Sequence, residues 1–224
     1  MTHPVEQQTT PHHFLVIDDH EAILAGIVSG LQNRYPTAEI VTAKDVESAE
    51  QALSRQQPTF VIVDLILPVQ PQKLPSAQAG IQLLEQLINS ELAPSLMVLS
   101  INTRPLIRLK SAINAYQGGF VALNKSATLQ DILNAVDIAL RGSIYLPPEV
   151  RSRPEFDQRW LQVLTLKYEE GLSDRAIAQA MGISDRTVRN YWSRIQDALN
   201  VYDDPQRDLR MQIQQAARKA GLVA

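Results

Sequence analysis

Short apolar runs rich in β-branched residues alternate with stretches of helical periodicity between residues 14 and 141. This alternation is typical of a parallel sheet whose strands are joined by covering helices. We predict strands near 14–18, 39–43, 59–64, 95–100 and 119–123. Helices are predicted near 21–34, 45–56, 80–90, 104–116 and 128–141. The pattern therefore predicts an α/β domain with five parallel strands.

Polar side chains stand where four of these runs end. Asp18 and Asp19 follow the first run, Asp64 interrupts the third, Ser100 closes the fourth and Lys125 follows the fifth. Five strands with five helices suit a flavodoxin-like, doubly wound sheet, which carries its site at the carboxyl ends of the strands. We therefore expect these side chains to gather at one edge of the sheet.

Three carboxylates in one place would repel one another unless a cation neutralised them. Mg²⁺ suits such a site, since it binds one or two carboxylates together with waters and a phosphate. A hydroxyl and an ammonium, from Ser100 and Lys125, are what an added phosphoryl group needs as hydrogen-bond donor and point charge. Taken singly, the residues have simpler interpretations: the acid pair and Ser100 as helix caps, Asp64 as a turn residue, and Lys125 as a solvated charge.

The ordered set Asp18-Asp19, Asp64, Ser100 and Lys125 resembles the receiver domain of two-component response regulators. The resemblance implies that a sensor histidine kinase phosphorylates Asp64. It also implies that Asp19 and Asp64 bind Mg²⁺ directly and that Asp18 binds it through water. In the same way, Ser100 would follow the phosphoryl group and Lys125 would pair with it.

Two further residues carry the resemblance. Phe120 would be the aromatic side chain that rotates inward on activation, and His20 after the acid pair is common in the NarL/FixJ branch. The chain also departs from the receiver pattern in three places. Ile101 replaces a small residue after Ser100 and is expected to crowd the pocket. Lys125 lies about two residues farther along the chain from Phe120 than the receiver pattern expects. The loop from Pro68 to Gly80 is longer than expected. The loop is interpreted either as a kinase-specificity or lid element or as a plain surface insertion.

The whole chain has the composition of an ordinary globular protein of one or two domains. No apolar run is long enough to span a bilayer, and there is no cysteine for a disulfide or a thiolate metal site. We therefore expect a cytoplasmic protein without a membrane partner. The balance of Lys and Arg against Asp and Glu is 9 to 13 up to Tyr145, or −4, and 12 to 11 beyond it, or +1.

Residues 142–154 are predicted to be a linker, because Gly142 ends a helix and Pro147 and Pro148 are expected to exclude another. Beyond the linker only helical patterns occur. We thus predict a disordered lead over residues 1–12, a receiver domain over 13–141 and a small all-α helix-turn-helix domain over 155–224.

The second domain contains two short helical patterns separated by a turn at Gly182, with Ser173 and Ser184 placed as N-caps. The segment from Gly171 to Val201 resembles the LuxR/NarL-type DNA-binding domain, and the helix before it is equally similar to region 4 of sigma factors. An outward helix with Arg and Asn can contact phosphates and base edges in the major groove. The residues expected to bind DNA are Asp185, Arg186, Thr187, Arg189, Asn190 and Arg194.

Together these features predict a DNA-binding response regulator, a transcription factor switched by Mg²⁺-dependent phosphorylation of Asp64. Its expected partners are a sensor histidine kinase, promoter DNA, RNA polymerase and a second copy of the chain. It is not expected to be an enzyme, apart from its own phosphoryl transfer and dephosphorylation. Two alternatives stay open: an atypical regulator whose receiver works without phosphorylation, in dimerisation or ligand sensing, and a sigma-like protein-interaction module.

Overall fold

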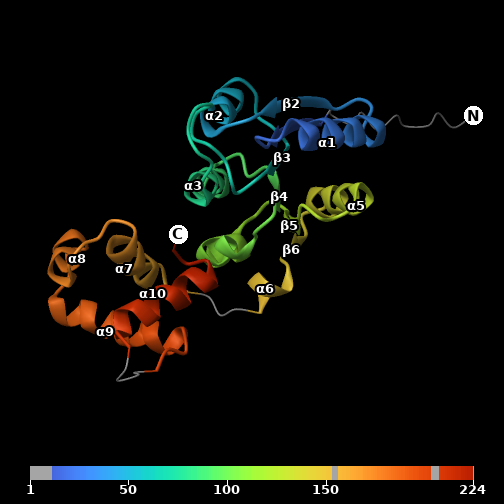
Figure 1. Cartoon of the computed structure of the whole chain (residues 1–224). Helices are drawn as coiled ribbons and strands as arrows, with labels where there is room; N and C mark the ends of the chain where they lie inside the picture. The colour runs from blue at the N-terminus through green and yellow to red at the C-terminus, as the bar shows by residue number, and fades with distance from the viewer. Residues whose placement is uncertain (1–11, 153–155, 203–206, 224) are drawn as a thin grey trace, which may run out of the picture. The chain divides into compact units, whose positions relative to one another are not determined.

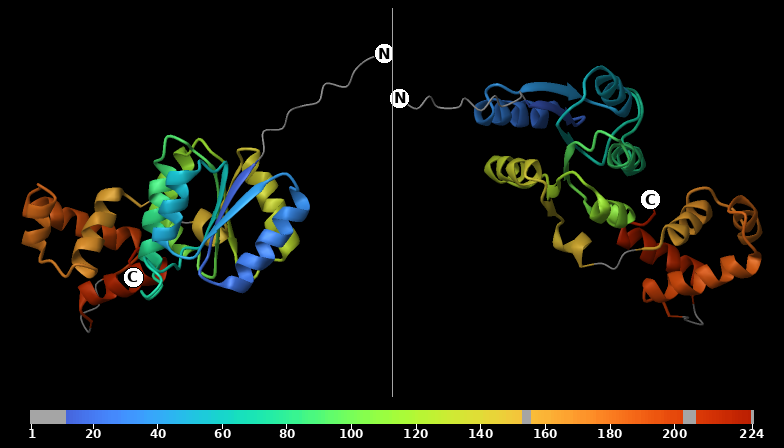
Figure 2. Two further views of the ribbon diagram at one scale, coloured as in Figure 1. Left: turned by 90° about the horizontal axis from the view of Figure 1, so that it is seen from above. Right: turned by 180° about the vertical axis from the view of Figure 1, so that it is seen from behind.

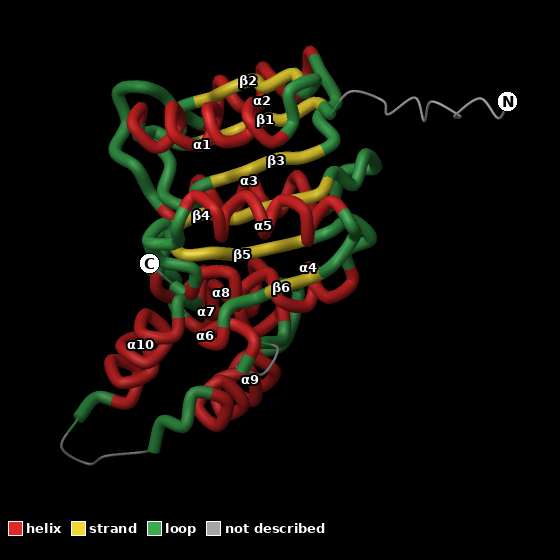
Figure 3. Tube along the Cα trace, turned by 90° about the vertical axis from the view of Figure 1, so that its right-hand side faces the viewer, coloured by secondary structure: helices red, strands yellow, loops and turns green. Residues whose placement is uncertain are grey.

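The computed structural model describes residues 12–152, 156–202 and 207–223. Within these ranges a single parallel sheet has the strand order β2-β1-β3-β4-β5-β6 (Figures 1 and 3). Its strands are β1 (His13–Ile17), β2 (Glu39–Ala43), β3 (Phe60–Val63), β4 (Ser95–Ser100), β5 (Phe120–Asn124) and β6 (Ile144–Tyr145). The chain adds strands first to one side of β1 and then to the other, so the predicted doubly wound fold is confirmed.

Four helices cover the two faces of this sheet. On one face α1 (Glu21–Arg34) packs beside α5 (Leu129–Leu140), and on the other α2 (Val46–Arg55) lies beside α3 (Ala77–Ile88) (Figure 2). Side chains of the strands and of α1 and α5 form a buried cluster that includes Phe14, Phe60 and Val136. Because both faces are covered, the central strand β3 is apolar throughout and every one of its residues is buried.

The chain divides into two compact units, Met1–Ile101 with Gln117–Tyr145 and Asn102–Tyr116 with Leu146–Ala224. The second unit contains the 3₁₀ helix η1 (Arg104–Leu109) and the helices α4 (Lys110–Ala115), α6 (Pro148–Arg151), α7 (Gln158–Tyr168), α8 (Asp174–Ala180), α9 (Asp185–Ala198) and α10 (Leu209–Ala220). The domain boundaries stay predictions, and residues 1–11 of the predicted lead lie outside the described residues.

Within the second unit, polar side chains join η1 and the residue before it to later helices. Thr103 Oγ1 donates to Glu149 Oε1 at 2.9 Å, and Arg108 Nη1 lies 3.6 Å from Glu169 Oε1. Thr103 is almost fully buried, so this hydrogen bond satisfies a hydroxyl that water does not reach. Residues 102–116 are therefore held by the C-terminal segment of the chain as well as by their own sequence neighbours.

Three local predictions differ from the structure. The sequence predicts one α-helix over 104–116, but this segment begins as a 3₁₀ turn with Pro105 in its first positions. Pro147 and Pro148 are expected to exclude a helix, yet α6 begins at Pro148, because the first helical position needs no N–H donor. Ile144 and Tyr145 extend the sheet by a sixth strand, paired with Phe120 and Val121.

Gly80 allows α3 to approach the loop after the third strand. A Cβ atom at this position would lie 2.1 Å from the carbonyl oxygen of Leu65, which no side chain can accept. Leu65 follows Asp64 directly, so the close approach of α3 determines the path of the backbone beside the acidic residue. A glycine here serves close packing rather than a turn.

Candidate functional site

Asp18 and Asp64 lie side by side because of the register of their strands. Ile17 of β1 pairs with Val63 of β3, and each acid is the next residue after that pair. The Asp64 N–H donates to Ile17 O at 3.0 Å, which continues the pairing by one residue. Each acid exposes only 2% of its surface. Buried carboxylates need partners, so their surroundings determine what this edge of the sheet can bind.

Lys125 supplies a cationic partner to both buried acids. Its Nζ lies 2.6 Å from Asp18 Oδ2 and 2.7 Å from Asp64 Oδ2, and its side chain is only 7% exposed. Burial alone lowers the pKa of Lys125, but the hydrogen bonds and charges of the two acids outweigh burial and raise it. The Lys125 N–H donates to Ser100 O at 3.1 Å, which fixes the lysine at the ends of β4 and β5.

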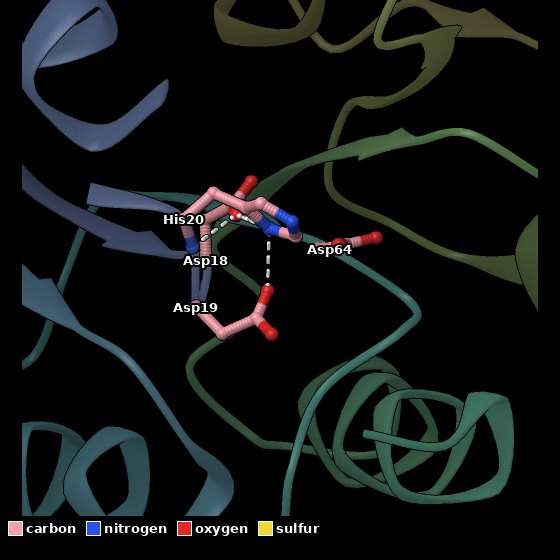
Figure 4. Close-up of side chains that lie close together, drawn as sticks. All are labelled: Asp18, Asp19, His20 and Asp64. Carbon is pink, nitrogen blue, oxygen red and sulfur yellow. Dashed lines mark hydrogen bonds and ion pairs between the residues drawn. The ribbon is translucent and has the colours of Figure 1, made fainter. Parts of the chain in front are cut away.

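His20 faces the acid pair, although in the sequence it serves only as a mark of the NarL/FixJ branch. It is the N-cap residue of α1, but its side chain makes no capping hydrogen bond. Instead Nδ1 lies 3.1 Å from Asp18 Oδ1 and 2.7 Å from Asp19 Oδ1 (Figure 4). The backbone N–H of His20 also donates to Asp18 Oδ1, at 2.9 Å. Direct adjacency to the acid pair was the signal that could have made His20 a site candidate.

The donor set of this edge suits a divalent cation. Asp18, Asp19, His20 and Asp64 each offer one ligand atom, and these atoms lie within 4.8 Å of one another. With a neutral imidazole, the three carboxylates and the one ammonium of Lys125 leave two negative charges, which a divalent ion would balance. Hard oxygen donors around a net negative site are what Mg²⁺ requires. The residues present therefore fit the ion.

Ser100, the last residue of the fourth strand, and Ile101, which follows it, lie in opposite environments. Ser100 is fully buried, and its Oγ has no hydrogen-bond partner among the residues that the structure describes. Ile101 is 66% exposed and makes its described contact through the backbone, where its carbonyl accepts from Asn124 Nδ2 at 3.1 Å. An unsatisfied buried hydroxyl beside an acidic cluster calls for a ligand as its partner.

Phe120 lies at the start of β5, paired with Leu96 and Ile144, and is fully buried. Lys125 follows the end of the same strand. Four residues at about 3.3 Å each place Phe120 roughly 13 Å from that end. The structure thus brings Asp18, Asp64 and Lys125 together and places Phe120 in the core at the far end of its strand. Its role as a switch stays a prediction from the resemblance.

The long loop after β3 is held at its base. Leu67 and Ser76 form an antiparallel bridge, with Ser76 N donating to Leu67 O at 2.9 Å. The first N–H groups of α2, from Val46 and Glu47, donate to the carbonyls of Pro68 and Val69, both at 3.1 Å. The loop is therefore closed at its base by its own backbone and attached to α2, and its functional role stays a prediction.

A helix-turn-helix is built by α8 and α9, as the sequence predicts. Ser173 Oγ accepts from Ala176 N at 3.2 Å, and Ser184 Oγ accepts from Thr187 N at 3.1 Å, so both predicted caps are present. Gly182 in the turn has a φ of +63°, which favours glycine. The side chains of Ile177, Val188 and Ile195 are fully buried on the inner face, whereas Met181 and Ile183 are only partly buried.

The outer face of α9 is polar and accessible. Thr187 is partly buried, and its hydroxyl lies 2.9 Å from Ser184 Oγ at the cap. The remaining predicted DNA-binding residues are exposed: Asp185, Arg186, Arg189, Asn190 and Arg194. A helix with three exposed arginines can follow a phosphate backbone and reach base edges.

A buried tryptophan connects the helices around the motif, and no sequence pattern singled it out. Trp192 Nε1 donates to Asp174 Oδ1 at 3.1 Å, and the Arg210 guanidinium lies 3.7 Å from the centre of the indole ring. Arg210 also pairs with Asp174 Oδ2 at 2.9 Å, while Tyr168 OH donates to Arg210 O at 2.7 Å. These contacts join α7, α8, α9 and α10 and hold α9 in place.

The chain is similar to response regulators of the NarL/FixJ type, with a receiver-like α/β sheet ahead of a helix-turn-helix. The predicted resemblance to this class is confirmed. Residues 161–196 match the family model for Sigma-70, region 4.

No helix of the described residues has the length and apolar character needed to cross a membrane.

Individual relatives match over most of the chain. The transcriptional regulatory protein YdfI of Bacillus subtilis (strain 168) is 22% identical over 84% of this chain and 89% of the relative. The DNA-binding transcriptional activator EvgA of Escherichia coli (strain K12) is 26% identical over 83% of this chain and 90% of the relative. The two-component response regulator RcsB, solved in complex with DNA, has a TM-score of 0.55 and 19% identity over 93% of this chain and 98% of that chain. The structural likeness supports the fold.

Proposed function

We propose that this protein is a DNA-binding response regulator that acts in the cytoplasm and is switched by phosphorylation of Asp64. The observation that carries the proposal is the pair of contacts from Lys125 Nζ to Asp18 and Asp64, at 2.6 and 2.7 Å. This arrangement holds a buried carboxylate next to a fixed ammonium and an acid pair, which is what acceptance of a phosphoryl group needs.

In the proposed reaction one carboxylate oxygen of Asp64 attacks the phosphorus of a phosphohistidine on a sensor kinase. The P–N bond breaks, the imidazole leaves with the electron pair, and an acyl phosphate forms on Asp64. Lys125 is placed to pair with the transferred oxygens and Ser100 to donate a hydrogen bond. A bound Mg²⁺ would neutralise part of the phosphoryl charge and would be held by Asp18, Asp19 and Asp64. Transfer back to water would make the domain the catalyst of its own dephosphorylation.

The output would come from α9. We propose that its exposed Arg186, Arg189, Arg194 and Asn190 contact promoter DNA, in line with the DNA complexes known for RcsB. A homodimer would read two half-sites about one helical turn apart, roughly 34 Å, and would then act on RNA polymerase. The names of the relatives, a DNA-binding activator and a transcriptional regulatory protein, support this assignment.

The phosphorylation test uses a small-molecule phosphodonor with Mg²⁺. We expect a mass addition of one phosphate, removable with hydroxylamine, on the wild-type chain and none on Asp64→Asn, because the amide cannot form an acyl phosphate. Asp131→Asn, which changes an exposed acid in the cap of α5, serves as the matched control and should be labelled like wild type. Equal labelling of Asp64→Asn and wild type would refute the assignment.

The DNA test compares the double variant Arg186→Ala, Arg189→Ala with wild type on a sequence selected from a random duplex library. We expect a loss of affinity of at least about thirtyfold, because each of the two base contacts contributes about 1–3 kcal/mol, and a shallower dependence on salt. Arg55→Ala, an exposed arginine on α2, should bind like wild type. Binding is measured by fluorescence anisotropy at several salt concentrations.

A second candidate function follows from the match of residues 161–196 to Sigma-70, region 4. A sigma-like module would contact RNA polymerase and need no direct base readout. Unchanged promoter binding by the double arginine variant, seen only in the presence of polymerase, would favour this alternative.

A further inference from the structure

Trp192 anchors the inner face of α9 to the neighbouring helices. Only 4% of its surface is exposed, and it lies about one turn from Val188 and from Ile195 on the same face. Its indole Nε1 donates to Asp174 Oδ1 at 3.1 Å, and its ring meets that of Tyr168 edge-on, with 6.0 Å between the centroids. Apolar burial has no direction, so a hydrogen bond from one edge of a large ring adds a restraint on the roll of the helix that burial alone does not supply.

Arg210, the second residue of α10, covers a face of the same indole ring. Its guanidinium carbon lies 3.7 Å from the ring centroid, and its Nη2 donates to Asp174 Oδ2 at 2.9 Å. The carbonyl of Arg210 accepts from Tyr168 OH at 2.7 Å. Asp174 thus accepts from the indole with one oxygen and from the guanidinium with the other. Because an acid of the same helical unit balances its charge, Arg210 is placed to act on α9 rather than on a phosphate.

The residues proposed to read DNA lie on the helix that Trp192 anchors, and Arg189 is three residues before it. On a helix whose radius with side chains is about 5–6 Å, a roll of about 10° moves a surface atom by about 1 Å. A hydrogen bond to a base edge spans only about 2.7–3.2 Å, so such a roll breaks it. The general attraction to phosphates depends on charge along the whole duplex and is much less sensitive to a shift of this size.

We propose that Arg210 is a positioning residue for base readout and that it acts through Trp192. By holding the indole against Asp174, the guanidinium fixes the roll of α9, so its loss lowers discrimination between target and other DNA more than it lowers DNA binding in general. The inference rests on the proposed function, because it concerns the helix proposed to contact promoter DNA. It connects α10 to sequence discrimination, although the predicted DNA-binding residues all lie on α9.

The test measures the affinity of the full chain for a duplex selected from a random library and for a shuffled duplex of the same composition, by fluorescence anisotropy at several salt concentrations. We expect Arg210→Met to lower the ratio of the two affinities at least about tenfold, while binding of the shuffled duplex changes less than about twofold and keeps its salt dependence. Arg210→Lys keeps the charge but loses the planar stack, so it should lower the ratio by about threefold. Lys219→Met removes an exposed cation from the same helix and, as the matched control, should keep the wild-type ratio.

A double variant tests whether Arg210 acts through the indole. Trp192→Leu should itself lower the ratio, and adding Arg210→Met to it should cause less than about a twofold further loss, because the contact is already gone. A further loss as large as that in the wild-type background would overturn the role of Trp192. Circular dichroism shows whether each variant is folded, and Arg210→Lys supplies the result if Arg210→Met does not fold.

The remaining outcomes separate the inference from the function on which it rests. Equal losses on the two duplexes with a shallower salt dependence would show that Arg210 contacts a phosphate, and would overturn the inference while the proposed function stands. An unchanged ratio in Arg210→Met or in Arg210→Lys would overturn the inference as well. A wild-type chain that selects no sequence from the library would instead refute the proposed function, and the inference with it.

Discussion

Lys125 is the residue on which the stability of the acidic site depends. Its ammonium lies between two carboxylates that are each 2% exposed, so its removal leaves two buried like charges without a counterion. We expect Lys125→Met to lower the free energy of unfolding by about 3 kcal/mol at neutral pH without divalent ions. Mg²⁺ should restore part of this loss, because a site with one more negative charge binds the ion more tightly.

The measurement is chemical denaturation of both chains with and without Mg²⁺. Lys44→Met is the matched control, since Lys44 pairs with Glu21 at 2.5 Å but both side chains are more than half exposed. An exposed pair contributes little, so this variant should unfold nearly like wild type and show no dependence on Mg²⁺. Equal losses in the two lysine variants would contradict the central role of the buried ammonium.

Residue types at strand ends made part of the site predictable. Asp18, Asp64 and Lys125 could be placed together because parallel strands end at one edge of the sheet. The pairing of Ile17 with Val63 brings Asp18 beside Asp64, as this reasoning predicts. His20 escaped prediction as a site residue because a histidine after a strand has no periodicity to mark it. The predicted strand near 119–123 already placed Phe120 at its start, as the structure has it, and the switch role of this residue depends on the resemblance alone.

At the scale of elements, α3 depends on the absence of a side chain at Gly80. A Cβ there would lie 2.1 Å from Leu65 O, so the helix or the loop after Asp64 must move. We expect Gly80→Ala to lower the free energy of unfolding by about 2–3 kcal/mol, the usual cost of overpacking a core position. It should also slow the labelling of Asp64 by the phosphodonor, because the displaced backbone follows that residue directly.

Gly26→Ala is the control for this prediction. Gly26 lies on the exposed face of α1, where a Cβ atom would have no neighbour within 4 Å, and alanine is the better helix former. This variant should be at least as stable as wild type and label at the same rate. A stable, fully labelled Gly80→Ala chain would show that the loop after β3 can move without consequence for the site.

The regular elements were predictable where periodicity was long, and the exceptions have local causes. The 14-residue α1 begins and ends where the pattern predicts. The elements that escaped prediction are short: β6 has two residues and α6 has four, too few for a period to be seen. The contacts of Trp192 with Asp174 and Arg210 could not be predicted either. Each of these residues is 18 positions from Trp192 in the sequence, and the packing of the helices brings them together.

On the scale of the whole molecule, several buried groups hold their protons more tightly in the folded chain than in the unfolded one. Burial raises the pKa of Tyr116 and Tyr168 to about 12, and burial with the neighbouring Asp137 raises that of Tyr35 to about 12. The pKa of Lys125 is raised by its two acids. A group whose pKa is higher in the folded chain than in the unfolded chain contributes its full stabilisation below the pKa of the unfolded chain. That value is near 10 for tyrosine and for lysine.

Above that pH the unfolded chain releases these protons first, so the stabilisation is lost as the pH rises towards the folded pKa values. We therefore expect the free energy of unfolding to be nearly constant from pH 7 to 9 and to fall steeply between pH 10 and 12. Tyr116→Phe should make the fall of the unfolding free energy with pH less steep in this range, because it removes one ionising group. Tyr145→Phe, at an exposed position, should leave the steepness of this fall unchanged. Denaturation followed by circular dichroism at each pH measures both. A slope that is the same for the two variants would show that the buried phenol does not couple to folding.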